Sequence, residues 1–469
     1  MRKRIQHILL AVLLIVAALR SIAQNNRDKY KLPGYEKFQL ANGLTVYLME
    51  KHTVPVVSIS AIVPAGAIYD GNNAGLANLT AECLKCGTKD YTKTQIEEAF
   101  DFAGAEYNTY GTKEFAGLTA RLAVKDEDKL FPVIKELLVD PVFNDSEFMK
   151  EKKRTLADLD QAKQSPGRVI NLYWDKFFYG DHVYGNIVTG TVSSITSLTA
   201  DNLKIFYKTY YSPQGSAIAL VGDFNTAEMK KKISQLFSGW KKTTASIVLP
   251  TAPTYQITTS RVLLINKDDA HETTFIIGTK GVPRNSPDYI PLQVVNTIFG
   301  GRFTSWLNEE LRVKSGLTYG AASYFDYKRN GGAFLISTHT ANATTAPTLE
   351  KTMEVINRLQ TQPIDDTTLM SAKNYMIGLF PPRFQSGSQL AGFLTGMFWY
   401  GYDESYINKF EENVNAVTIG KAEEVVQKYF PKNNLQFVLI GKSADIKKIV
   451  EKYGTVTEVQ IKDDVGKGF

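Results

Sequence analysis

Residues 75–88 read Gly-Leu-Ala-Asn-Leu-Thr-Ala-Glu-Cys-Leu-Lys-Cys-Gly-Thr, the most informative stretch of the chain. It predicts a helix over residues 75–85. Asn78, Ala81 and Glu82 are three and four residues apart, so they share one face of that helix. The face therefore carries one amide, one methyl group and one carboxylate.

The same stretch resembles the metal-binding helix of the pitrilysin and insulinase family of zinc metallopeptidases, which reads Gly-Leu-Ala-His-x-x-Glu-His and ends near a Gly-Thr pair. Here Asn78, Ala81 and Glu82 stand in place of the first His, the Glu and the second His. The third ligand of the family is a Glu about 76 residues further on, in a helix that ends before a proline. Asp158, eight residues before Pro166, falls at that position.

This set of residues argues against zinc chemistry in the chain itself. Zinc binds imidazole, thiolate or carboxylate donors, and catalysis requires a carboxylate that takes the proton from the bound water. Asn78 is a poor ligand and Ala81 accepts no proton, so Asn78, Glu82 and Asp158 together predict a chain without metal. The alternative that we favour is that Glu82 and Asp158 are ordinary solvated helix carboxylates.

The N-terminus has the pattern of a secretory signal peptide. It begins with Met1-Arg2-Lys3-Arg4, continues with an apolar run over residues 8–19, and has Ser21-Ile22-Ala23 at its end. The apolar run is shorter than the roughly 20 residues that span a membrane. We expect cleavage after Ala23, removing residues 1–23, and an exported protein, periplasmic or secreted, without a membrane span in its mature form.

The net charge gives no reason to expect a nucleic-acid partner. Residues 1–23 contain four basic and no acidic residues, so their removal lowers the formal charge from +6 to +2. A nearly neutral chain without a basic tract lacks the electrostatic features that bind phosphate backbones.

Only two cysteines are present, Cys83 and Cys86, so the fold does not depend on a disulfide framework. Their Cys-x-x-Cys spacing also raises the possibility of a redox function. Residues three apart in a helix hold their β-carbons about 5–6 Å apart, whereas a disulfide requires about 3.8 Å. We favour two free thiols, with a strained disulfide as the alternative.

Length and composition predict two domains. After the leader roughly 445 residues remain, more than one hydrophobic core usually supports. Residues 243–254 are rich in Thr, Ala and Pro, which is typical of a connector. We therefore expect an N-terminal domain over residues 24–242, a linker over 243–256 and a C-terminal domain over 257–469.

Hydrophobic periodicity predicts the main elements. We expect a hairpin over residues 38–49 with a turn at Asn42-Gly43, a strand over 57–63, a charged amphipathic helix over 145–164, a strand over 272–279, and helices over 288–298 and 304–314. The apolar stretch 380–402 either lines a chamber or a subunit contact, or forms plain core.

A repeated pattern near the end of each half indicates an internal duplication. Lys-Thr-Tyr-Tyr-Ser-Pro at 208–213 leads to Ala-Leu-Val-Gly at 219–222, and Lys-Tyr-Phe-Pro at 428–431 leads to Val-Leu-Ile-Gly at 438–441. A helix, a proline-bearing turn, a buried strand and a glycine thus recur at an offset of 219 residues. The family resemblance implies the same architecture: an α+β fold of two tandem homologous domains, each a largely antiparallel sheet with helices packed on one face, forming half of a clamshell.

A second stretch, residues 300–319, resembles the family segment Gly-Gly…Ser-x-Leu…Leu-Arg…Gly-Leu-x-Tyr. Phe303, Leu307 and Leu311 recur every four residues and should form a buried helix stripe, with Arg312 on an adjacent face. We expect Gly316 to allow the turn into a strand that carries Tyr319.

The resemblance implies that Arg312 and Tyr319 donate hydrogen bonds to the peptide carbonyl that is attacked, and that Gly300 and Gly301 bind substrate. A guanidinium and a phenol suit this task, because both donate to an oxygen that becomes negative. The alternative is that Arg312 makes a surface ion pair and Tyr319 is a half-buried strand aromatic.

The resemblance to two-chain members of the family implies a non-catalytic subunit of a heterodimeric zinc metallopeptidase. Its partner would be a homologous subunit with an intact His-x-x-Glu-His that carries the zinc, and its substrate an unfolded peptide. This chain would hold no cofactor and be inactive alone. Two alternatives are a peptide-binding or scaffold protein without a hydrolytic role, and a self-sufficient hydrolase with an altered metal site.

Overall fold

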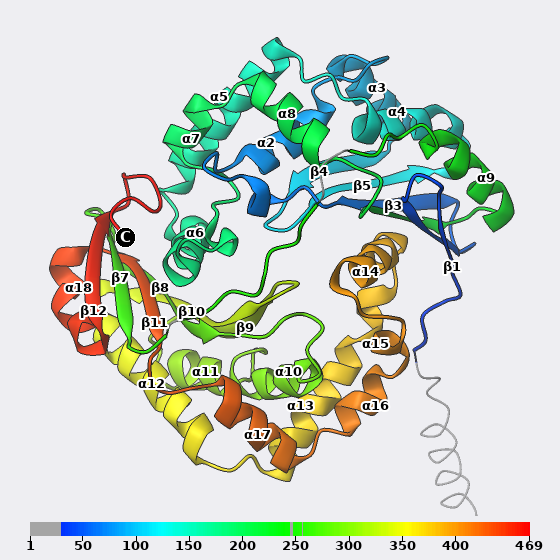
Figure 1. Ribbon diagram of the computed structural model, residues 1–469. Helices are drawn as coiled ribbons and strands as arrows, with labels where there is room; N and C mark the ends of the chain where they lie inside the picture. The colour runs from blue at the N-terminus through cyan, green and yellow to red at the C-terminus, as the bar shows by residue number, and fades with distance from the viewer. Residues whose placement is uncertain (1–29, 244–246, 256) are drawn as a thin grey trace, which may run out of the picture.

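The computed structural model describes residues 30–243, 247–255 and 257–469 (Figure 1). The predicted signal peptide lies outside these ranges. Within them, no helix is both long enough and apolar enough to cross a membrane.

The first half contains a six-stranded mixed sheet in the order β1-β2-β6-β3-β5-β4. Its strands are β1 (Glu36–Gln39), β2 (Thr45–Glu50), β3 (Val56–Val63), β4 (Glu106–Gly111), β5 (Ala116–Ala123) and β6 (Ala217–Gly222). Strands β2 and β6 are parallel and every other pair is antiparallel. The predicted hairpin is confirmed, and Gly43 in its turn has a φ of 93° that favours glycine.

The second half repeats this sheet in the order β12-β7-β11-β8-β10-β9. Its strands are β7 (Arg261–Asn266), β8 (Glu272–Lys280), β9 (Ala321–Tyr327), β10 (Gly332–Ala341), β11 (Gln436–Gly441) and β12 (Thr455–Gln460). Strands β6 and β11 are 219 residues apart and hold the third position in their sheets. Each pairs in parallel on one side and antiparallel on the other. The duplication predicted from the sequence is confirmed.

Helices cover the outer face of each sheet (Figure 1). The helices of the first half are α2 (Leu76–Glu82), α3 (Lys93–Ala103), α4 (Glu127–Val139), α5 (Asp145–Ala162), α6 (Pro166–Tyr179), α7 (Val192–Ser197), α8 (Ala200–Tyr210) and α9 (Thr226–Phe237). The helices of the second half are α10 (Tyr289–Phe299), α11 (Trp306–Asn308), the π-helix η5 (Glu309–Lys314), α12 (Thr345–Thr361), α13 (Asp366–Leu379), α14 (Gly387–Tyr400), α15 (Ser405–Asn408), α16 (Phe410–Asn415), α17 (Ile419–Tyr429) and α18 (Ser443–Val450).

Short 3₁₀ turns connect several of these elements. They are η1 (Ala67–Tyr69), η2 (Cys83–Lys85), η3 (Val124–Asp126), η4 (Val183–Gly185), η6 (Asn342–Thr344), η7 (Pro381–Phe384) and η8 (Glu451–Tyr453).

Each half contributes one helix that packs on the sheet of the other half. Helix α14 of the second half packs on β3 and β6 of the first sheet, and α6 of the first half packs on β8 and β11 of the second. Both faces of β3 are therefore buried, and Ser60 Oγ lies 3.0 Å from Thr395 Oγ1 of α14. The apolar stretch 380–402 accordingly contributes core. The exact domain boundaries proposed from the sequence stay a prediction.

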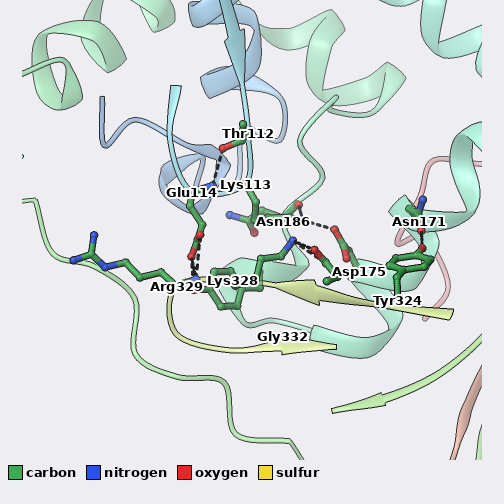
Figure 2. A network of polar contacts seen from close by, with 12 residues as sticks. Thr112, Lys113, Glu114, Asn171, Asp175, Asn186, Tyr324, Lys328, Arg329 and Gly332 are labelled. Atoms are coloured by element: carbon green, nitrogen blue, oxygen red, sulfur yellow. Dashed lines mark hydrogen bonds and ion pairs between the residues drawn. The ribbon is translucent and has the colours of Figure 1, made fainter. Parts of the chain in front are cut away.

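A polar network joins the two halves (Figure 2). Glu114, in the connection between β4 and β5, accepts hydrogen bonds from Tyr184 Oη at 2.6 Å, the Arg329 amide at 2.9 Å and Trp399 Nε1 at 3.3 Å. Lys113 beside it pairs with a carboxylate of α6, and Glu114 is only 4 % exposed. The network ties the β4–β5 hairpin to the β9–β10 hairpin and to α14.

Candidate functional site

Hydrogen bonds from two other segments fix the position of helix α2. The carboxyl group of Asp70 accepts hydrogen bonds from the amides of Gly75, at 2.9 Å, and Ala77, at 2.7 Å, which satisfies donors at the start of the helix. Asn78 Oδ1 accepts from the amide of Gly111 on β4 at 3.2 Å. The amide oxygen of Asn78 therefore serves to attach α2 to the sheet edge.

Glu82 is neutralised by basic side chains. Its carboxylate lies 2.7 Å from Lys85 Nζ and 3.6 Å from Arg154 of α5, and Arg154 also binds Glu151. The hydrogen bond to Glu151 raises the pKa of the Arg154 guanidinium; partial burial opposes this, and the charges of Glu82 and Asp158 add to it. A permanent cation thus lies beside the carboxylate at the position of the second family ligand.

Asn78, Glu82, Arg154 and Asp158 line one cavity of 300 Å³, which we call the vestigial centre. Asp158 is exposed, as the solvated-carboxylate interpretation expects, whereas Glu82 is partly buried and ion-paired. Ala81 is fully buried in the core behind α2 and presents no group to the cavity.

These residues do not fit a catalytic zinc ion. One amide oxygen is already bonded to Gly111, one carboxylate is paired with two cations, and no side chain at residue 81 can take a proton. Across residues 30–243, 247–255 and 257–469, no group of three His, Cys, Asp or Glu side chains is placed to hold a metal. We therefore assign no metal-dependent chemistry to the residues of this chain.

Sequence reasoning missed Arg154 and Lys85. Arg154 lies three residues after Glu151 and four before Asp158, a spacing that places all three on one face of α5. The pattern was visible in the sequence, but the contact across to α2 depends on how the two helices pack.

A larger cavity of 780 Å³ lies at the other side of the α5–α6 connection. Ser165 of that connection and the first two residues of α6 line it, together with Gly300, Gly301 and Arg312 of the second half. Three of the four residues predicted to support substrate therefore meet at one cavity. A Cβ at Gly300 would lie 2.3 Å from Ser323 Oγ, so this glycine is also required for packing against β9.

Arg312 lies in the π-helix η5, with its guanidinium over the ring of Phe303 at 4.6 Å from the centroid. Within the described part of the chain, its guanidinium makes neither an ion pair nor a hydrogen bond, so the surface ion pair considered from the sequence is not observed. π-Helical segments occur frequently at functional sites. Arg312 lines the cavity, and its guanidinium has no fixed acceptor among these residues.

Two expectations about this segment are wrong. Phe303 is 62 % exposed rather than buried, because the helix begins only after Ser305, whereas Leu307 and Leu311 within the helical segment are buried as expected. Tyr319 lies in a loop before β9 rather than in a strand, because the hydroxyls of Thr318 and Thr338 bind the carbonyl of Gly320. Tyr319 is 80 % exposed and does not line the 780 Å³ cavity.

The two cysteines are free thiols in the structure, and both are buried. The hydrogen bond between the two thiols raises the pKa of Cys83 and lowers the pKa of Cys86. Because both thiols are buried and inaccessible, the geometry gives no support to catalytic redox chemistry.

The chain matches the models of two protein-family domains. Residues 45–192 match the model described as insulinase (peptidase family M16), and residues 197–376 match the model described as peptidase M16 inactive domain. The chain belongs to peptidase family M16. The helix-and-strand arrangement described above is that of this family, with its two homologous domains.

Relatives of this M16 protein carry different descriptions. An uncharacterized zinc protease of Rickettsia felis is 28% identical over 309 residues, which are 65% of this chain and 73% of the relative. A non-peptidase homolog of Helicobacter pylori, YmxG, is 23% identical over 395 residues, 84% of this chain and 90% of the relative.

Solved structures share the fold. The crystal structure of a peptidase M16 inactive domain from Pseudomonas fluorescens has a TM-score of 0.80 at 25% identity, covering 87% of this chain and 98% of that one. A protease from Helicobacter pylori has a TM-score of 0.81 at 19% identity, over 87% of this chain and all of that one. The inactive-domain fold and the non-peptidase name are consistent with a non-catalytic member of the family.

Proposed function

We propose that this chain is the non-catalytic subunit of a heterodimeric zinc metallopeptidase that acts outside the cytoplasm. Its partner is a homologous subunit with an intact His-x-x-Glu-His, which supplies the zinc and the general base. This chain binds the unfolded peptide and donates hydrogen bonds from Arg312 and Tyr319 to the carbonyl oxygen under attack.

The proposal is supported by the contrast between the vestigial centre and the surroundings of Arg312. At the vestigial centre, Asn78 is bonded to the sheet and Glu82 is paired with Arg154, so neither is free to bind a metal ion. Arg312, in contrast, is held by its stacking on Phe303 and turns to a large cavity without a bonded acceptor in the described residues. A positive donor held in this way suits an oxygen that gains negative charge.

The loop that carries Tyr319 is fixed at both ends. The amide of Leu317 donates to the carbonyl of Leu311 at 2.8 Å, and Thr338 Oγ1 donates to the carbonyl of Gly320 at 2.8 Å. The exposed phenol of Tyr319 does not line the 780 Å³ cavity of this chain, and it is accessible to a second chain. This supports a role for Tyr319 in the assembled pair.

Reconstitution tests the proposal. The purified chain is mixed with a homologue that carries an intact His-x-x-Glu-His, and cleavage of an unfolded peptide is measured for each chain and for the mixture. We expect a complex and cleavage by the mixture alone. Peptide binding by this chain, with no gain in cleavage on mixing, would instead favour the scaffold function.

A further inference from the structure

Residues 462–469, which we call the tail segment, return from the second sheet to the surface of the first half. Figure 1 shows this red segment beside α7 and above β12. Asp464 and Val465 line the 300 Å³ cavity together with Asn78, Glu82 and Arg154. The tail segment therefore forms part of the wall of the vestigial centre.

The carboxylate of Asp464 binds two successive backbone amides. Its two oxygens accept from the amides of Val192 and Ser193, each at 3.1 Å. Hydrogen bonds from backbone amides to a charged carboxylate are stronger than those between neutral groups. This contact selects for a carboxylate at one position of the segment.

The backbone of the tail segment is recognised by a lysine. Lys163 Nζ donates to the carbonyl of Lys462 at 2.8 Å and to that of Asp463 at 3.3 Å. Both acceptors are peptide carbonyls, so this contact does not depend on the side chains of the bound segment.

An aromatic surface receives the far end of the segment. The ring of Phe469 lies 6.3 Å from that of Tyr173, stacked, and 6.2 Å from that of Phe177, edge-on. With Phe469 in place, Tyr173 and Phe177 of α6 are buried, and such ring pairs add to the free energy of burial. The surface thus contacts three separate features: a carboxylate, a stretch of backbone and an aromatic ring.

We propose that this surface, formed by Lys163, Tyr173, Phe177 and the amides of Val192 and Ser193, is a peptide-binding site that the tail segment occupies within its own chain. It accepts extended segments with a carboxylate and, five residues later, an aromatic ring. A peptide that binds this surface displaces the tail segment from the wall of the vestigial centre. This site does not depend on the proposed subunit function.

Hydrogen exchange on the full-length chain tests the site. The amides of Val192 and Ser193 have the Asp464 carboxylate as their acceptor. Asp464→Ala is expected to speed their exchange roughly 10- to 100-fold, since each bond involves a charged acceptor. Asp463→Ala removes the same charge from a carboxylate that pairs with Lys467 at 3.4 Å, and should leave the exchange of both amides unchanged.

Addition of the segment in trans completes the test. An acetylated synthetic peptide with the sequence of residues 460–469, at saturating concentration, should restore protection of both amides in the Asp464→Ala protein. The same peptide carrying Asp464→Ala should not. Lys163→Ala provides a second route, because it should release the segment and speed tryptic cleavage after Lys462 while Asp464 is intact. Equal exchange in the native and Asp464→Ala proteins, or failure of the peptide to protect, would overturn the site.

Discussion

Arg312→Ala is expected to lower the turnover of the assembled pair by roughly 100- to 1000-fold, the usual cost of losing one oxyanion donor. Assembly itself should persist, because the Arg312 side chain contacts only the ring of Phe303 among the interactions described above. Turnover is measured with saturating peptide, and assembly by size-exclusion chromatography of the mixture.

Arg302 provides the matched control, since it lines the same cavity and carries the same charge. Its guanidinium donates to Ser371 Oγ at 3.0 Å and is therefore committed to α13. Arg302→Ala should change turnover less than roughly tenfold, on the scale of a general electrostatic effect. Similar losses for both variants, or an unchanged rate for Arg312→Ala, would exclude the assigned role.

Glu114→Ala is expected to lower the free energy of unfolding by about 3–5 kcal/mol. The substitution leaves Tyr184 Oη, the Arg329 amide and Trp399 Nε1 without their acceptor at a buried junction of the two halves. Urea unfolding followed by tryptophan fluorescence measures the change, because Trp399 itself belongs to the network (Figure 2).

Glu106→Ala is the control for this result, because Glu106 lies on β4 of the same hairpin and is exposed. Surface substitutions of this kind usually change stability by less than about 0.5 kcal/mol. Glu114→Gln, which keeps one acceptor oxygen, should fall between the two. If Glu114→Ala were as mild as Glu106→Ala, the network would not join the halves.

The sequence predicted those features that depend on local pattern. The Asn42-Gly43 hairpin, the helix that contains Asn78 and the repeat that ends at Gly222 and Gly441 all appear where expected. Each rests on periodicity or turn chemistry that the chain carries within about 20 residues.

Features that depend on packing between distant segments could not be predicted. Nothing in residues 387–400 or 166–179 indicates that these helices cross to the sheet of the other half. The exposure of Phe303 depends on where the helix begins, and the loop position of Tyr319 depends on a hydrogen bond from the distant Thr338. The pairing of Glu82 with Arg154 likewise depends on two helices meeting.

The zinc content of the isolated full-length chain distinguishes a non-catalytic subunit from a self-sufficient hydrolase. The chain is equilibrated with zinc, passed through metal-free buffer and analysed by mass spectrometry, and its peptide cleavage is measured in parallel. Because Asn78 is bonded to Gly111 and Glu82 is paired with Arg154, we predict far less than one zinc per chain and no cleavage. One tightly bound zinc per chain, with cleavage that Glu82→Ala abolishes, would contradict the account.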